Sequence, residues 1–176
     1  SLVAHIKNTR TPFSIDFGVG DVIVPKQEKR KIPTQLDDFA SPTVNTYSLE
    51  TTIAEKLDAI LDLMEFSSRM KDYYDIYYLA NKFDFDGGTL TKALKKTFEN
   101  RGHAFTIEQF EQVMAFAEND AMQKKWKAFC RKIDTKTDDF NAVLKTIKAF
   151  LIEPFMAAVE NKEFEEKWTA ANGEWM

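Results

Sequence analysis

Two aspartates interrupt an otherwise aromatic and aliphatic stretch, SRMKDYYDIYYL, at residues 68–79. On a helix, Asp72 and Asp75 lie on one side and share a row with Ile76 and Leu79, which are typical core residues. A buried carboxylate is costly unless it is paired with a cation or binds something. The two aspartates therefore indicate either a structural ion-pair cluster or a functional site, and we expect them to be partly or largely buried.

Cations that could meet these aspartates lie nearby in the sequence. Lys56 belongs to the row Ile53–Lys56–Ile60 of the preceding predicted helix, at the margin of its apolar stripe. A short connection joins the two helices, so the lysine and the aspartates could meet across a helical hairpin. Arg69 and Lys71 are further candidate partners. Periodicity alone favours a structural network, because such networks perturb charged groups as readily as active sites do.

A third candidate carboxylate, Asp16, lies in a strand-like stretch where Phe13, Ile15 and Phe17 alternate with polar residues. This alternation predicts a strand whose three apolar side chains pack beneath a sheet. Asp16 points to the other face, and we expect it to share a cleft with Lys56. A strand aspartate binds Mg²⁺ only if further oxygen ligands converge on the ion.

The elements that would position these residues fall into two regions. Residues 1–47 are strand-like, with a second short strand predicted in DVIVP (21–25) and a polar, proline-containing loop that could hold one more. Residues 48–176 show helical periodicity. We therefore predict an α+β, mostly helical fold, in which a small N-terminal sheet (1–47) precedes a helical domain (48–176).

Local signals set several expected helix ends. The capping residues are Ser48, the Thr106–Gln109 pair and Gly102. Pro154 is expected to interrupt the last helix. Residues 84–86, which read Asp-Phe-Asp before two glycines, are predicted to form a loop.

Composition excludes several classes of protein. The chain has 176 residues, 44% of them hydrophobic, which suits one globular domain or one domain with a small appendage. The net charge of −4 gives no overall attraction to nucleic acid. A single cysteine, Cys130, excludes a disulfide framework and fits the cytoplasm. No apolar run approaches the length of a membrane span. The strand-like start at Ser1 indicates a chain cut from a longer one.

Two basic runs, KQEKRK (26–31) and KKWKAFCRKIDTK (124–136), could contact RNA phosphates, with Trp126 available for stacking. Basic helix faces are more often only solvated, and Trp126 and Cys130 fall at core spacing. His5 and His103 are isolated in the sequence and are not expected to bind a metal.

Three ordered motifs together resemble the AbiEii family of nucleotidyltransferase-fold proteins, the toxins of abortive-infection, type IV toxin–antitoxin systems. The motifs are FSIDFGVGDVIVP, YSLETTIAEKLDAIL and SRMKDYYDIYYLA. The resemblance is strong over residues 13–80 and weaker beyond them. It implies that the N-terminal sheet is part of a nucleotidyltransferase fold, and that a nucleotide passes from a nucleoside triphosphate to an acceptor hydroxyl, in some members the end of a tRNA. Mg²⁺ is the implied cofactor and an antitoxin the implied partner.

The resemblance also implies roles for individual residues. Asp16 matches the family's third metal carboxylate, and Lys56 matches a lysine that contacts the nucleotide phosphates. Asp72 and Asp75 match the late acidic motif, with candidate catalytic roles in orienting Lys56 or accepting the acceptor's proton. The candidate nucleotide-binding cations are Lys56, Arg69 and Lys71.

The family's first motif, a Gly-Ser turn followed by an Asp-x-Asp strand, has no counterpart in this sequence. That motif supplies the other two metal carboxylates. The chain is therefore expected to be the later portion of a longer nucleotidyltransferase, and to be inactive and weak in Mg²⁺ binding by itself. The alternative is a non-catalytic protein- or RNA-binding module with the same architecture.

Overall fold

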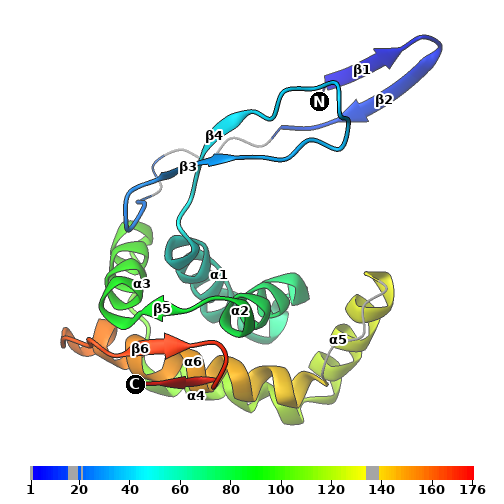
Figure 1. Cartoon of the computed structure of the whole chain (residues 1–176). Coiled ribbons are helices and arrows are strands. Elements are labelled where there is room, and N and C mark those ends of the chain that lie inside the picture. Colours follow the sequence, from blue (N-terminus) through cyan, green and yellow to red (C-terminus); the bar gives the residue numbers. More distant parts are fainter. Residues whose placement is uncertain (1, 16–19, 21, 134–138) are drawn as a thin grey trace.

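The computed structural model describes residues 2–15, 20, 22–133 and 139–176. Helices dominate it (Figure 1). They are α1 (Leu49–Leu63), α2 (Met70–Lys82), α3 (Gly87–Arg101), α4 (Ile107–Met114), α5 (Asp120–Lys132) and α6 (Phe140–Glu160), with short 3₁₀ turns at Met64–Phe66 and Ala115–Glu118. The predicted class, α+β and mostly helical, is confirmed.

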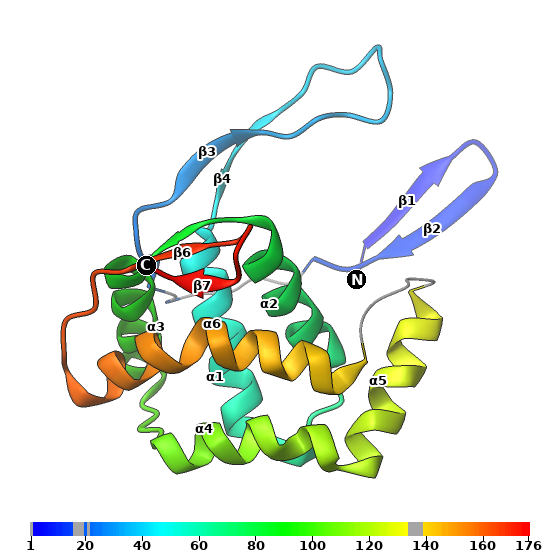
Figure 2. The same ribbon diagram turned by 60° about the horizontal axis from the view of Figure 1, so that its bottom comes forward.

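Helix α1 lies at the centre and packs against α2, α3 and α4. Its buried apolar residues recur at helical spacing, as the sequence predicted: Ile53, Leu57, Ile60 and Leu61. Helix α6 crosses the bundle and packs against α2, α3 and α4 (Figure 2). It is buried along most of its length because its sequence is apolar on several sides. Each large side chain buried here contributes about 1.5–3 kcal/mol of hydrophobic stabilisation.

The predicted helix caps are confirmed. The Ser48 side chain accepts from the backbone N–H of Thr51 at the start of α1. Thr106 and Gln109 form the reciprocal capping box of α4. Gly102 ends α3 with φ of 69°, a left-handed conformation that favours glycine.

The predicted interruption at Pro154 is wrong, because α6 continues through it to Glu160. Proline has no N–H to donate to the carbonyl of Phe150 one turn earlier. The indole Nε1–H of Trp175 donates to that carbonyl instead, at 3.0 Å. A side chain from the C-terminal segment thus replaces the hydrogen bond that the proline removes.

A three-stranded antiparallel sheet covers one end of the bundle. It consists of β5 (Phe85–Asp86), β6 (Lys167–Thr169) and β7 (Glu174–Trp175), in that order. The loop predicted at residues 84–86 is therefore partly wrong, since Phe85 is a buried strand residue paired with Trp168. The indole of Trp168 donates to the carbonyl of Ala80 in the last turn of α2, at 2.7 Å.

The N-terminal strands form two separate antiparallel ribbons that project from the helices (Figures 1 and 2). One pairs β1 (Leu2–Ile6) with β2 (Thr9–Phe13), and the other pairs β3 (Glu28–Lys31) with β4 (Thr43–Thr46). In the described part of the chain, no second layer covers these ribbons closely enough to bury them, since nearly all of their residues are exposed.

Of the strands predicted at residues 13–17 and 21–25, only Phe13 lies in a strand among the residues that the structure describes. Strand β2 ends at Phe13, and neither Ile15 nor residues 22–25 belong to a strand. Phe13 and Ile15 are 44% and 54% exposed, so they do not pack beneath a sheet. A two-stranded ribbon has no covered face, and alternation alone cannot supply one. Phe17 lies outside the described residues.

Candidate functional site

The side chain of Lys56, on α1, lies between two carboxylates of α2. Its Nζ is 2.9 Å from Oδ1 of Asp72 and 2.6 Å from Oδ2 of Asp75. The helices are consecutive and pack side by side, and the three-residue spacing of the aspartates turns both toward α1. The predicted meeting across the helical hairpin is confirmed.

Two further cations hold the aspartates from the solvent side. Arg69 pairs through Nε with Oδ2 of Asp72, and Lys71 pairs through Nζ with Oδ2 of Asp75. The side chains of Arg69 and Lys71 are 57% and 70% exposed. We call these five residues the Lys56 cluster. Three cations against two carboxylates leave the cluster with a net charge of +1.

The predicted burial of the aspartates is confirmed, to different extents. The Asp72 side chain is 4% exposed and has a cation on each oxygen. The Asp75 side chain is 20% exposed, and its two lysine partners share one oxygen. Asp72 is therefore the member whose charge depends most on the cluster, while Asp75 lies closer to water.

The ammonium of Lys56 has competing influences on its pKa. Burial lowers the pKa, but hydrogen bonds and charge attraction from Asp75 and Asp72 outweigh it and raise the pKa above its ordinary value. Lys56 is therefore cationic at neutral pH and cannot serve as a general base. Two of its three donors face the carboxylates, which leaves one for another acceptor.

The position of Asp16 lies outside the described residues, so its shared cleft with Lys56 stays a prediction. The neighbouring backbone is anchored beside α1 and α3. The Val24 carbonyl accepts from the Ser48 hydroxyl at 2.6 Å, and the Gly20 carbonyl accepts from the Asn100 side chain at 3.0 Å. Within the described ranges, no group of three or more His, Cys, Asp or Glu side chains could hold a metal ion.

Sequence reasoning missed a second charged cluster on another side of α1. The Asp58 side chain is 1% exposed, and its two oxygens contact Nη1 of Arg101 at 2.9 Å and Nδ1 of His103 at 2.8 Å. His103 is thus not isolated in the fold, although 45 residues separate it from Asp58. The contacts tie α1 to the end of α3. The signal in the sequence was Asp58 itself, an aspartate on the buried side of α1 that needs a cationic partner.

Part of the second basic run holds the backbone that leads into α2. The Nζ of Lys125, on α5, donates to the carbonyls of Glu65 and Ser67, at 2.8 and 3.0 Å. These carbonyls lie in the connection that precedes Arg69. Trp126 is buried as predicted, whereas Cys130 is only half-buried.

Replacing Asp75 with asparagine is expected to lower the free energy of unfolding by only about 1 kcal/mol. Lys56 keeps its contact with Asp72, and the partly exposed site admits water to solvate Lys71. Urea denaturation followed by circular dichroism measures the change. A loss as large as that of Asp72→Ala would contradict the unequal burial of the two aspartates.

Comparison with known proteins gives one match. A family model described as the nucleotidyl transferase AbiEii toxin of a type IV toxin–antitoxin system matches residues 2–171. Neither the curated proteins nor the solved structures include a significant match. Among the described residues, no helix is both long and apolar enough to cross a membrane.

Proposed function

This chain belongs to the AbiEii family of nucleotidyltransferase toxins from type IV toxin–antitoxin systems, and on that premise we propose that it transfers a nucleotide from a nucleoside triphosphate to a hydroxyl group of RNA or another acceptor. The observation that carries the proposal is the Lys56 ammonium, held between Asp72 and Asp75 beside two exposed cations.

Nucleotide transfer depends mainly on positioning the phosphates and neutralising their charge. The net positive charge of the Lys56 cluster favours a triphosphate. Lys56 offers its remaining donor, while Arg69 and Lys71 extend from the exposed rim. Asp72 and Asp75 fix the direction of the Lys56 side chain. Asp75, the more exposed of the two, is the candidate acceptor of the attacking hydroxyl's proton.

Mg²⁺ does not suit the Lys56 cluster. Both carboxylates already pair with cations, and the positive net charge of the cluster repels a divalent ion. The proposed metal carboxylate is Asp16, in the segment matched to the family's third carboxylate. We propose no catalytic step through the ion. A cognate antitoxin and a cytoplasmic setting complete the proposal.

A non-catalytic protein- or RNA-binding module is the second candidate. Its support is that the Lys56 cluster satisfies its own charges. Every carboxylate in it has two cationic partners, and the cluster joins two consecutive helices. Holding α1 against α2 would by itself explain the presence of such a network, without any role in catalysis.

Incubating the natural protein that contains this chain with labelled nucleoside triphosphates, Mg²⁺ and total RNA is expected to label RNA. The 176-residue chain by itself is expected to transfer no nucleotide, because it matches only one of three expected metal carboxylates. Electrophoresis of the RNA measures both. Labelling by the chain alone would show a complete metal site within it, and no labelling by the natural protein would favour the binding module.

A further inference from the structure

We propose that the turn at the end of the β3–β4 hairpin, residues 36–39, docks into the cavity between α5 and α6 of a second copy of this chain. The turn is apolar and acidic, whereas the cavity has an apolar floor and a cationic rim. We call the two halves of the contact the hairpin tip and the α5–α6 cavity. Neither half includes a residue of the Lys56 cluster, so the contact does not depend on the proposed nucleotide transfer.

The hairpin tip is an ordered turn. The Phe39 N–H donates to the Leu36 carbonyl at 3.2 Å, and the Thr34 hydroxyl lies 3.1 Å from the carbonyl oxygens of both residues. The Ile32 N–H donates to the Pro42 carbonyl at 2.9 Å, which extends the pairing of β3 and β4 toward the tip. A turn that is ordered before it binds loses less conformational entropy on docking.

The side chains of the hairpin tip are free to meet a partner. Leu36 and Phe39 are each 60% exposed, and the two residues between them, Asp37 and Asp38, are exposed as well. Among the residues that the structure describes, no cation forms an ion pair with either aspartate. Exposed apolar side chains that form one patch mark interaction sites, whereas singly scattered ones do not. The tip therefore offers two apolar anchors and two unpaired negative charges.

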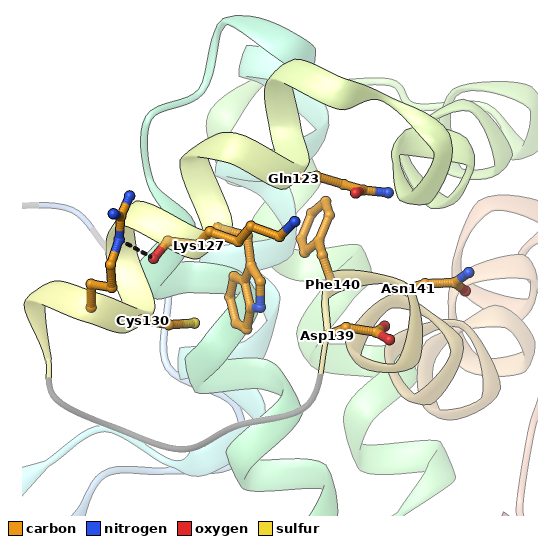
Figure 3. A pocket seen from close by; sticks show the side chains of 8 residues that line it. Gln123, Lys127, Cys130, Asp139, Phe140 and Asn141 are labelled. Atoms are coloured by element: carbon orange, nitrogen blue, oxygen red, sulfur yellow. Dashed lines mark hydrogen bonds between the residues drawn. The ribbon is translucent and has the colours of Figure 1, made fainter.

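The α5–α6 cavity has a volume of about 780 Å³ and opens where α5 meets the start of α6. Trp126 and Phe140 form its floor, with ring centroids 5.4 Å apart. Lys127 and Arg131 also line it, and Figure 3 shows Lys127 reaching from α5 toward Phe140. Pockets that hold small ligands measure about 300–1,000 Å³, so this cavity has room for the apolar side chains of a turn.

Charge favours an acidic occupant of the cavity. In the part of the chain that the structure describes, no carboxylate forms an ion pair with Lys127 or Arg131. Asp139 lines the cavity too, but it caps α6 by accepting from the Ala142 N–H at 2.8 Å. The first turn of α6 adds the partial positive charge of a helix N-terminus. The two aspartates of the tip can therefore meet two cations, while its apolar side chains meet aromatic rings.

The tip that fills the cavity comes from another molecule. The β3–β4 hairpin projects from the helices in both views, away from α5, so the tip and the cavity of one chain lie well apart (Figures 1 and 2). A second copy supplies a tip of matching chemistry. Two copies that exchange their tips form the contact twice, as in a symmetric dimer. The second contact then forms within one assembly, which strengthens an association built from two small contacts.

Sedimentation equilibrium of the 176-residue chain, over a wide range of protein concentration, measures the association. The wild type is expected to form dimers. Phe39→Ala is expected to weaken dimerisation about tenfold, because the ring is the largest anchor of the tip. Lys127→Glu with Arg131→Glu is expected to weaken it by a similar factor, because the aspartates of the tip then face like charges. A wild-type chain that stays monomeric at every concentration overturns the proposal.

Matched controls change similar residues outside the two halves. Ile6→Ala removes a 73% exposed apolar side chain from the β1–β2 ribbon. Lys124→Glu with Lys132→Glu reverses two exposed cations of α5 that do not line the cavity. Each control is expected to change the dissociation constant less than about twofold, since contacts outside the anchors are nearly neutral. Equal losses in the controls and in the tip and cavity variants would overturn the proposal.

An exchange of charges tests the pairing of tip and cavity directly. Asp37→Lys with Asp38→Lys is expected to weaken self-association, because lysines then face the cationic rim. Mixing this variant with the Lys127→Glu, Arg131→Glu variant is expected to restore dimers, since both contacts of the mixed pair join opposite charges. A mixture that associates no better than either variant alone would contradict the assigned contact.

The thiol of Cys130 lines the cavity and allows a covalent test. Phe39→Cys, mildly oxidised with diamide, is expected to give dimers in which the new thiol at position 39 is linked to Cys130 of the second copy. Ile6→Cys is the control and is expected to form no link to Cys130. Mass spectrometry of proteolytic peptides identifies the linked pair. If position 39 links only to position 39 of the other copy, the tips meet each other and the cavity is not their site.

Discussion

Replacing Asp72 with alanine is expected to lower the free energy of unfolding by about 3–5 kcal/mol, the cost of removing one partner from a buried ion pair. Lys56 and Arg69 both lose a carboxylate at a position that is almost closed to water. For a domain with about 5–15 kcal/mol of stability, this loss is severe. Urea denaturation of the 176-residue chain, followed by circular dichroism, measures it.

A compensated variant separates charge from packing. Lys56→Met combined with Asp72→Leu removes the buried pair and keeps apolar volume, so it is expected to recover most of the loss, as apolar replacements of buried pairs do. If Asp72→Ala unfolds at the same urea concentration as the wild type, Asp72 does not depend on its cations. If the double variant is no more stable than Asp72→Ala, the loss comes from the missing carboxylate contacts of Asp72 and not from the uncompensated charge of Lys56 or from lost volume.

The same pairing sets an alkaline limit to stability. The pKa of Lys56 is raised in the folded chain, so its contribution is complete below the ordinary lysine value of about 10.4 and disappears as the pH rises through the raised pKa. Neutral and mildly acidic conditions should leave the Lys56 contribution intact.

Helix periodicity and capping could predict the central hairpin because those signals are local. The apolar stripe of α1, its Ser48 cap and the three-residue spacing of the aspartates are all contained within single helices. The short connection then brings α1 and α2 together, so spacing and connection length could predict that Lys56 and Asp72 come within reach of each other, and the structure shows their contact.

Features that depend on distant segments could not be predicted in this way. Pro154 is tolerated because Trp175 satisfies the carbonyl that the proline leaves free. Asp58 and His103 meet only after α3 has packed on α1. Phe13 and Ile15 alternate as strand residues do, but alternation indicates only which side chains share a face. It does not indicate whether a second layer covers that face, and here both side chains are exposed.

Replacing Lys56 with arginine is expected to lower nucleotide transfer by the natural protein about 100-fold, a loss typical of removing one preorganised charge contact. Arginine keeps the positive charge between Asp72 and Asp75, so the free energy of unfolding should fall by no more than about 1.5 kcal/mol. Its planar guanidinium, however, matches carboxylates in a fixed fork and cannot hold the compact position of an ammonium directed at a phosphate. Initial rates with labelled nucleoside triphosphate, beside urea denaturation, measure the two effects.

Lys71→Arg is the matched control, because Lys71 pairs with the same Asp75 oxygen but its side chain is 70% exposed and free to adjust. Its transfer rate should stay within about threefold of the wild type, because arginine keeps the positive charge that Lys71 offers to the phosphates and an exposed side chain can adjust its position. A Lys56→Arg protein that folds and transfers at the wild-type rate would leave Lys56 with a structural role only. If both proteins are equally stable, and Lys56→Arg loses transfer while Lys71→Arg retains it, the Lys56 ammonium acts on the nucleotide. The reason is that arginine at position 56 preserves the ion pairs and changes only the geometry of the cation.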